Sequence, residues 1–131
     1  MKIIFLSLPE ITRLHLDQIA TFGGTKGIRD LNSLKSALST PKATYDGQFL
    51  HPTIYEMASA YLFHIVKNHP FIDGNKRAGT MAMLVFLAIN NYNFNAPNKD
   101  LLETVLQVAQ GKVSKSELSI FIKKWTLQQG Q

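Results

Sequence analysis

The sequence has no cysteine among its 131 residues and only one tryptophan. Disulfides and thiolate metal sites are therefore excluded, as is typical of a chain that works in a reducing cytosol. Long apolar runs are missing too, because the longest, residues 81–89, falls far short of the roughly 20 residues of a membrane span. The apolar start, residues 1–6, is too short for a signal peptide. We therefore expect a cytoplasmic protein with no membrane segment.

The composition predicts one globular domain, residues 1–131. Hydrophobic residues make up 45% of the chain and charged residues 18%, outside the range of disordered sequences. The net charge of +5 suits nucleic acid, an acidic protein or a phosphate-bearing ligand, and charge alone does not choose among them. Lysines and arginines are spread along the chain and give no helix a dense basic face, so direct nucleic-acid binding is not expected.

Capping signals predict the first two helices. Ser7 and Glu10 form a capping-box pattern for a helix that the two glycines at 23–24 end. A second, short helix is capped by Asp30 or Asn32 and closed by a proline. The first helix has an approximate apolar stripe made of Ile11, Leu14, Ile19 and Phe22.

The middle of the chain predicts a buried pair of helices. Apolar residues repeat at three- and four-residue steps from Pro52 until the chain reaches Pro70, which no helix easily precedes. The next helix runs from about Asn75 to Asn90 and has almost no polar face. A helix that is apolar all round yet too short for a membrane is a central, buried helix.

Two further helices and a short strand complete the expected fold. Asp100 caps one helix that Gly111 ends, and Ser114 caps the last, with Glu117 in capping-box register. Residues 2–6 are rich in β-branched and aromatic side chains and predict a short strand. The fifth helix carries the apolar residues Leu101, Leu102, Val105, Leu106 and Ala109. The sequence thus predicts an all-α domain of about six helices around a buried central pair.

Residues 42–50 break the helical pattern. Tyr45, Asp46 and Gly47 carry a turn signal, so we expect a loop or a small hairpin here.

The connection between the two central helices, residues 69–77, has the residue types of a phosphate site. Gly74 lets the backbone approach a ligand closely. The N–H groups of Gly74, Asn75 and Lys76 would be free donors at the positive end of a helix. Lys76 and Arg77 add two cations beside them.

Two more residues of this segment suit group transfer. His69 can accept a proton near neutral pH, and Asp73 offers the hard oxygen that Mg²⁺ prefers. Each residue alone has an ordinary structural reading as a helix end, a turn or a solvated charge. A base, a metal carboxylate and a phosphate cradle within one turn together indicate phosphoryl or nucleotidyl transfer.

The segment His69-Pro70-Phe71-Ile72-Asp73-Gly74-Asn75-Lys76-Arg77 resembles the signature loop of the Fic/Doc superfamily, His-x-Phe-x-[Asp/Glu]-Gly-Asn-[Gly/Lys]-Arg, at every prescribed position. The stretch Gly23–Asp30, then Leu34 with Ala37, and Tyr45-Asp46-Gly47 are similar to the death-on-curing (Doc) toxin branch. The resemblance covers essentially the whole chain and implies the fold already expected.

The resemblance also implies roles for the site residues. His69 would take the proton from a hydroxyl of a target protein, and Asp73 would hold Mg²⁺ on the phosphates of ATP. Gly74, Asn75 and Lys76 would bind phosphate oxygens, and Arg77 would stabilise developing charge.

Two more elements have implied roles. Lys67 stands where relatives carry a basic residue, and it would bind phosphate. The segment with Tyr45, Asp46 and Gly47 would be a flap that aligns the target peptide, in the manner of an added strand.

Two departures from the AMP-transferring pattern indicate the reaction. That pattern has a second glycine where this chain has Lys76, and another arginine where it has Thr80. Both differences are features of the Doc branch, which passes on the γ-phosphate of ATP. Gly74 is the residue of the AMP-transferring pattern, so AMP transfer remains the alternative.

The resemblance also implies partners. The chain lacks the inhibitory helix motif Ser/Thr-x-x-x-[Ala/Pro]-Glu-[Gly/Asn] that restrains many Fic proteins. Restraint should then come from a cognate, Phd-like antitoxin whose disordered tail folds over the site. The implied target is a translation factor, elongation factor Tu, whose modification would halt translation.

A third hypothesis is an inactive regulatory or nucleic-acid-binding module, against which the intact His69, Asp73, Asn75 and Arg77 argue. The other histidines, His15, His51 and His64, have no partners at metal-ligand spacing and predict surface or helix positions, so no zinc site is expected.

Overall fold

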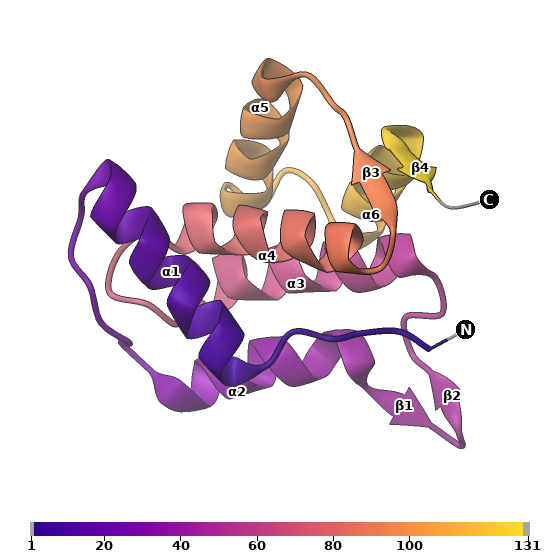
Figure 1. Cartoon of the computed structure of the whole chain (residues 1–131), viewed down its shortest axis with the longest axis horizontal. Coiled ribbons are helices and arrows are strands. Elements are labelled where there is room, and N and C mark those ends of the chain that lie inside the picture. Colours follow the sequence, from indigo (N-terminus) through magenta and orange to yellow (C-terminus); the bar gives the residue numbers. More distant parts are fainter. Residues whose placement is uncertain (1, 130–131) are drawn as a thin grey trace.

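The computed structural model describes residues 2–129 and confirms the all-α class. Within these residues, short strands and one turn of 3₁₀-helix (Thr40–Lys42) accompany the α-helices (Figure 1). The helices are α1 (Leu8–Phe22), α2 (Leu31–Ser39), α3 (Ile54–Asn68), α4 (Asn75–Ile89), α5 (Asn98–Ala109) and α6 (Lys115–Lys124). The strands are β1 (Thr44–Tyr45), β2 (Gln48–Phe49), β3 (Tyr92–Phe94) and β4 (Thr126–Gln128).

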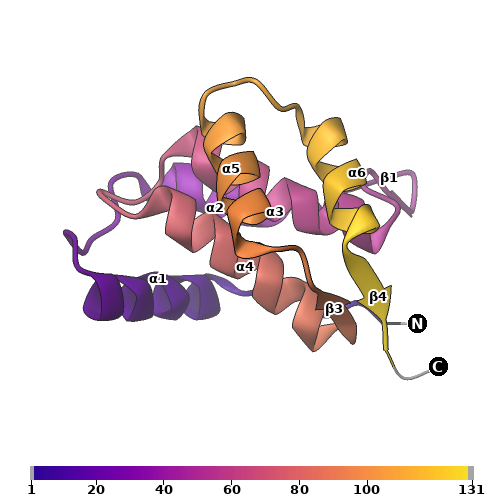
Figure 2. The same cartoon turned by 90° about the horizontal axis from the view of Figure 1, so that it is seen from above.

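Helices α3 and α4 form the predicted central pair. They lie side by side in the middle of the molecule, with α1 and α2 to one side and α5 and α6 to the other (Figures 1 and 2). Gly79 of α4 allows the close approach, because a Cβ there would lie 3.2 Å from the carbonyl oxygen of Leu62 on α3. The largest fully buried side chains include Tyr61, Phe71 and Phe86, which come from α3, the connection after it and α4.

Side-chain caps, all predicted from the sequence except Thr53, explain where four helices begin. Ser7, Thr53 and Ser114 each bond the backbone N–H three residues on, and a glutamate there reaches back to the cap, so all three are capping boxes. Asp30 is the cap of α2. The expected cap Asp100 was wrong: α5 begins earlier, after Pro97, and Asp100 lies in its first turn, where a negative charge suits the helix dipole.

The N-terminal residues are extended but do not form the predicted strand. Their polar groups bond side chains instead of a neighbouring strand: Asn90 binds both the N–H and the C=O of Ile4, and the Tyr61 hydroxyl accepts from Leu6 N–H. A strand needs a partner edge, and none lies beside these residues in the described chain. The sequence missed the antiparallel pair β3–β4, because three-residue strands carry almost no periodicity.

The segment 42–50 forms the small hairpin that its turn signal predicts. Strands β1 and β2 pair with Thr44 opposite Phe49 and Tyr45 opposite Gln48. Asp46 and Gly47 both have positive φ, 52° and 77°, as a tight two-residue hairpin turn requires. In the described residues, no helix is long and apolar enough to cross a bilayer.

Candidate active site

The signature loop joins the C-terminus of α3 to the N-terminus of α4. His69 ends α3 in the left-handed conformation, with φ 50° and ψ 52°, which stops the helix one residue before Pro70. Arg29 holds this end of α3: its Nε donates to the carbonyl of His69 at 2.5 Å and its Nη2 to that of Asn68 at 2.9 Å. A cation on the last carbonyls of a helix is favourable.

His69 is exposed, and its hydrogen bond fixes its tautomer. Its Nδ1 lies 3.1 Å from the carbonyl oxygen of Val66. A carbonyl only accepts, so Nδ1 carries the proton, and Nε2 of the neutral ring is left with a lone pair. The geometry therefore leaves His69 Nε2 as a proton acceptor.

The middle of the loop is held by its own side chains and by the segment before α2. The Asn75 side chain accepts from Phe71 N–H at 2.9 Å and donates to Phe71 C=O at 3.0 Å. Ile72 N–H bonds Gly27 C=O, and Arg29 N–H bonds Pro70 C=O. The buried Asn75 amide is thus committed to the loop, and only its backbone N–H is left for the phosphate role that the sequence predicted.

Asp73 is held as a charged acceptor. Its Oδ2 accepts from Thr25 N–H at 3.0 Å and its Oδ1 from Gly74 N–H at 2.8 Å. These bonds, Thr25 first, lower the pKa of the carboxyl group, and the neighbouring Arg77 and His15 add to the effect. The Asp73 side chain is therefore ionised near neutral pH, as a Mg²⁺ ligand must be.

The N-terminus of α4 has no side-chain cap. Gly74 is the cap residue, at φ 76°, and no side chain bonds the first N–H groups of the helix from that position. One expectation needs correction: the Gly74 N–H is not free, because it donates to Asp73 Oδ1. A ligand would have to displace that carboxylate oxygen to reach it.

These groups line one pocket of about 360 Å³. His69, Asp73 and the start of α4 form one part of its wall, and Lys67 from the last turn of α3 lies beside them. The full lining is Val66, Lys67, His69, Ile72, Asp73, Gly74, Asn75, Lys76, Arg77 and Ala109. The structure therefore gathers all the predicted residues of the loop, and Lys67, at one cavity.

Arg77 borders the pocket but is committed to α1. Its Nη1 donates to the carbonyls of Gly23 at 2.9 Å and Gln18 at 3.4 Å, near the C-terminus of that helix. A Cβ at Gly24 would lie 3.1 Å from Arg77 Nη2 and 2.6 Å from Asp73 Oδ2. Only glycine at position 24 leaves room for both charged groups.

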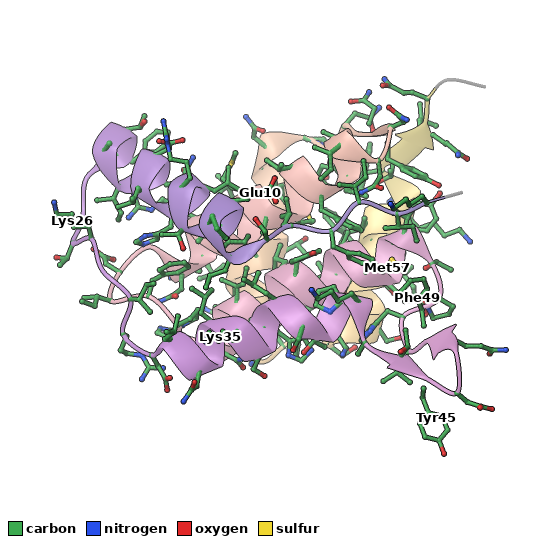
Figure 3. All side chains as sticks on the ribbon, turned by 60° about the horizontal axis from the view of Figure 1, so that its bottom comes forward. Glu10, Lys26, Lys35, Tyr45, Phe49 and Met57 are labelled. Atoms are coloured by element: carbon green, nitrogen blue, oxygen red, sulfur yellow. The ribbon has the colours of Figure 1, made fainter. Side chains whose placement is uncertain are left out.

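The hairpin that was predicted to act as a target-peptide flap lies away from the pocket. Tyr45, Asp46 and Gly47 precede the N-terminus of α3, whereas His69 ends its C-terminus, and 15 residues of helix separate them by about 22 Å along the axis. Figure 3 shows Tyr45 pointing into solvent at one end of the molecule and Lys26 at the other. No residue of the hairpin lines the pocket. The segment that does lie against the loop is Gly27–Arg29.

Sequence reasoning missed three supporting groups. His15 lies on a helix, as expected, but it is 1% exposed and lies beneath the loop. Its place four residues after Ile11 on the apolar stripe was the signal for burial. Arg29 had no assigned role. Thr25 acts through its backbone N–H, which every residue but proline has, so no side chain could have revealed it.

His51 and His64 are also not plain surface residues. Their Nε2 atoms lie 3.0 and 3.1 Å from Lys115 Nζ, which ties the end of the hairpin and α6 to α3. Burial and the Lys115 charge lower the pKa of both rings, that of His64 to about 4.

The residues fit Mg²⁺ only together with a phosphate ligand. Among the described residues, no three His, Cys, Asp or Glu side chains gather as an all-protein metal cage. Mg²⁺ in phosphate-binding enzymes is commonly held by one or two carboxylates and by the substrate's phosphates. Asp73 supplies one ionised carboxylate for Mg²⁺. The start of α4, Lys67 and Lys76 line the same pocket and could hold the phosphates that would supply the other ligands.

Comparison with known proteins decides the family. The model of the Fic/DOC family matches residues 5–87, more than half of the chain, including α3, the loop and most of α4. The chain belongs to the Fic/Doc family.

Two relatives are similar to this chain, one with higher identity over a shorter stretch and one with lower identity over most of the chain. "Toxin Doc" of Mycolicibacterium smegmatis is 37% identical over 75 residues, which cover 57% of this chain and 58% of that protein. "Protein kinase doc" of Escherichia phage P1 is 25% identical over 120 residues, covering 91% of this chain and 93% of that one. The chain therefore matches less than two thirds of the first relative and nearly all of the second.

Proposed function

We propose that this protein is a Doc-type toxin that transfers the γ-phosphate of ATP to a Ser or Thr hydroxyl of a cytosolic protein. One observation carries the proposal: His69 Nε2, the ionised Asp73 and the N-terminus of α4 line the same pocket. A proton acceptor, a metal carboxylate and an anion site are the parts that phosphoryl transfer requires. The phage relative, named as a protein kinase, supports the choice.

The residues divide the work as follows. The target hydroxyl attacks the γ-phosphorus as its proton passes to His69 Nε2, and the bond to the β–γ bridging oxygen breaks to release ADP. The phosphate oxygens are bound by the backbone N–H groups of Gly74, Asn75 and Lys76. The side chains of Lys67 and Lys76 add positive charge to the same oxygens. Mg²⁺ on Asp73 would neutralise phosphate charge when bound. Arg77 adds positive charge from its place against α1.

The alternative reaction, AMP transfer, differs in which phosphorus faces the attacking oxygen. Lys76 is exposed and lines the pocket, so it places a charged side chain at a wall where glycine would have none. Thr80 bonds its hydroxyl to Lys76 C=O and offers no cation of the kind the AMP-transferring pattern has there. Both features favour γ-phosphate transfer, whereas Gly74 is the feature that favours AMP transfer.

Paired labelling tests the proposal. Purified protein, Mg²⁺ and a bacterial extract are incubated with ATP labelled on the γ-phosphate and, in parallel, on the α-phosphate. Label from γ alone supports the kinase, and label from α alone supports AMP transfer. No label from folded protein would favour the inactive regulatory module. Purified elongation factor Tu is the first single target to test.

The sharpest variant is His69→Asn, because asparagine tolerates the left-handed conformation of residue 69 but is not a base. It should fold normally and lose labelling by at least about a hundredfold, the usual contribution of a general base. Asp73→Asn should weaken Mg²⁺-dependent nucleotide binding. Asp46→Asn in the hairpin is its matched control and should bind like the unmodified protein.

We infer that the target chain aligns along Gly27–Arg29 and not along the hairpin. Gly27 C=O and Arg29 N–H bond the loop, so the N–H and C=O of Ile28 point to the opposite side. Neither group has a hydrogen-bond partner among the described residues. Ile28 therefore offers an open edge beside the signature loop, to which an extended target segment could add. Ile28→Pro should lower labelling of the target without lowering ATP binding.

We also propose where a Phd-like antitoxin binds. An apolar groove of about 720 Å³ runs between α1, α4 and α5, and Lys76 and Arg77 line both it and the pocket. Phe22 belongs to the predicted apolar stripe of α1, and Leu102 and Leu106 to the apolar residues of α5. They are 69%, 67% and 48% exposed and line this groove. A disordered tail that folds into an amphipathic helix would cover them and reach the pocket. Leu102→Asp should weaken antitoxin binding and leave labelling unchanged.

A further inference from the structure

A buried histidine of α1 lies directly beneath the signature loop. The His15 ring stacks on the ring of Phe71, with centroids 3.8 Å apart and planes 5° from parallel. Its Nε2 lies 2.7 Å from the backbone carbonyl oxygen of Asp73. His15 is 1% and Phe71 0% exposed, so the contact is sealed from solvent. The side chain thus reaches the loop's backbone at the residue that precedes Gly74.

The direction of this hydrogen bond is fixed. A carbonyl oxygen has no proton to give, so His15 Nε2 carries one and donates it. The bond is short for an N–H···O contact, and its donor lies on a side chain that is 1% exposed, which favours a single arrangement.

Fixing the Asp73 carbonyl also fixes the N–H of Gly74. The two groups belong to one planar trans peptide and point in opposite directions. Because His15 holds the oxygen against α1, the N–H is turned to the other side, where it meets Asp73 Oδ1 at the pocket. This N–H is the first donor of the uncapped N-terminus of α4.

Gly74 cannot hold that orientation by itself. It has φ 76°, and glycine adopts positive and negative φ about equally, so the peptide between residues 73 and 74 has little intrinsic preference. A residue with a Cβ would be constrained, but a Cβ at position 74 would lie 3.3 Å from both Arg77 Nη2 and Ile19 Cδ1. The loop therefore needs an external hold on this peptide.

We propose that His15 is a positioning residue that orients the Asp73–Gly74 peptide, so that the Gly74 N–H points into the pocket as a phosphate donor. It touches neither substrate nor metal and acts through the backbone of the loop. The inference rests on the proposed phosphate-binding function of this pocket, and it adds a residue outside the signature loop to the site.

Two variants separate the hydrogen bond from the packing. His15→Phe keeps a ring against Phe71 but removes the donor, whereas His15→Gln loses the ring but can place an amide N–H at a similar reach. Arg13→Gln is the control, because Arg13 lies on the exposed face of α1 and pairs with Asp17. Binding of ATP with Mg²⁺ is measured by calorimetry, and folding by thermal unfolding.

We expect His15→Phe to bind ATP about tenfold more weakly than the unmodified protein, the factor that a charge-assisted hydrogen bond typically supplies. His15→Gln should stay within about threefold, and Arg13→Gln should not differ. If instead ATP affinity falls in proportion to the loss of thermal stability, and His15→Gln binds ATP as weakly as His15→Phe, the role of His15 is packing and the proposal is wrong. Unchanged binding in His15→Phe would also overturn it.

A second readout does not depend on transfer activity. In ¹H–¹⁵N NMR spectra, titration with inorganic phosphate should shift the Gly74 amide in the unmodified protein and in His15→Gln, but much less in His15→Phe. If no target is labelled yet these shifts occur, the kinase proposal fails while the His15 proposal stands. If the Gly74 amide never responds to phosphate or ATP, the His15 proposal fails whatever the enzyme activity.

Discussion

Substituting Gly24 by alanine should damage the site out of proportion to its effect on folding. The new Cβ would lie 2.6 Å from Asp73 Oδ2 and 3.1 Å from Arg77 Nη2 and Ile19 Cδ1. Real Cβ atoms essentially never approach a heavy atom to within 3.0 Å, so the Asp73 carboxylate or the Gly24 backbone must move. Either movement breaks the hydrogen bond from Thr25 N–H to Asp73 Oδ2.

The expected magnitude has two parts. Gly24 has φ 116°, and an L-residue forced to positive φ costs about 1–2 kcal/mol of folding free energy. The second part is functional: loss of a partner that orients a metal ligand typically lowers metal affinity about 10–100-fold. Mg²⁺-dependent ATP binding should fall by that factor.

Gly47→Ala is the matched control. Gly47 also has positive φ, 77°, but a Cβ there meets nothing within 4 Å and the hairpin lies away from the pocket. Both variants should lose a similar free energy of unfolding in urea, whereas calorimetry should show weakened Mg²⁺–ATP binding for Gly24→Ala alone. Equal nucleotide binding by the two variants would refute the argument that Gly24 makes room for Asp73 and Arg77.

Two further predictions concern the C-terminus of α3 and the contact between α3 and α6 at His64 and Lys115. Arg29→Met should lower the free energy of unfolding in urea by about 1–2 kcal/mol, because the carbonyls of Asn68 and His69 lose their charged donor; an unchanged value would mean that water replaces it fully. Stability should also fall between pH 6.5 and 4, because the folded state keeps His64, with its pKa lowered to about 4, neutral while the unfolded chain binds a proton. The pKa change of His64 corresponds to about 3 kcal/mol, which solvent screening of this half-buried side chain reduces to about 1–2 kcal/mol. Lys115 and His51 are the charged or titratable groups facing His64, and Glu56 faces His51. Denaturation measured across this range should therefore show a slope that His64→Gln flattens, and an equal slope in that variant would contradict the assignment.

Some features could be predicted from local sequence because their causes are local. A capping box needs only residues three apart, so Ser7 with Glu10 and Ser114 with Glu117 mark helix starts without tertiary information. Asp46-Gly47 marks the hairpin for the same reason, since the turn requires two positive φ angles. The absence of a polar face similarly predicted that α4 lies in the centre.

Errors arose where a residue's partner lies far along the chain. Residues 2–6 have strand composition, but Asn90 and Tyr61 take the hydrogen bonds that a neighbouring strand would have taken. Leu102 and Leu106 continue an apolar pattern on α5, yet only packing decides which of two apolar faces turns inward. The flap role of the hairpin was expected from the resemblance alone, and the turn signal that predicts the hairpin does not say at which end of α3 it will lie.

The sequence by itself determined the chemistry of the loop. Its residue types and spacing supply a histidine, a carboxylate, two cations and the glycine that starts α4, since all lie within nine positions of one another. Only the tertiary structure decided how that loop is held. His15, Thr25 and Arg29 contact it across 40 to 58 residues of chain, as the Arg29–His69 and His15–Asp73 bonds show. Such contacts form because burying α1 and α2 against the central pair brings them there, and no local pattern records which groups will then meet.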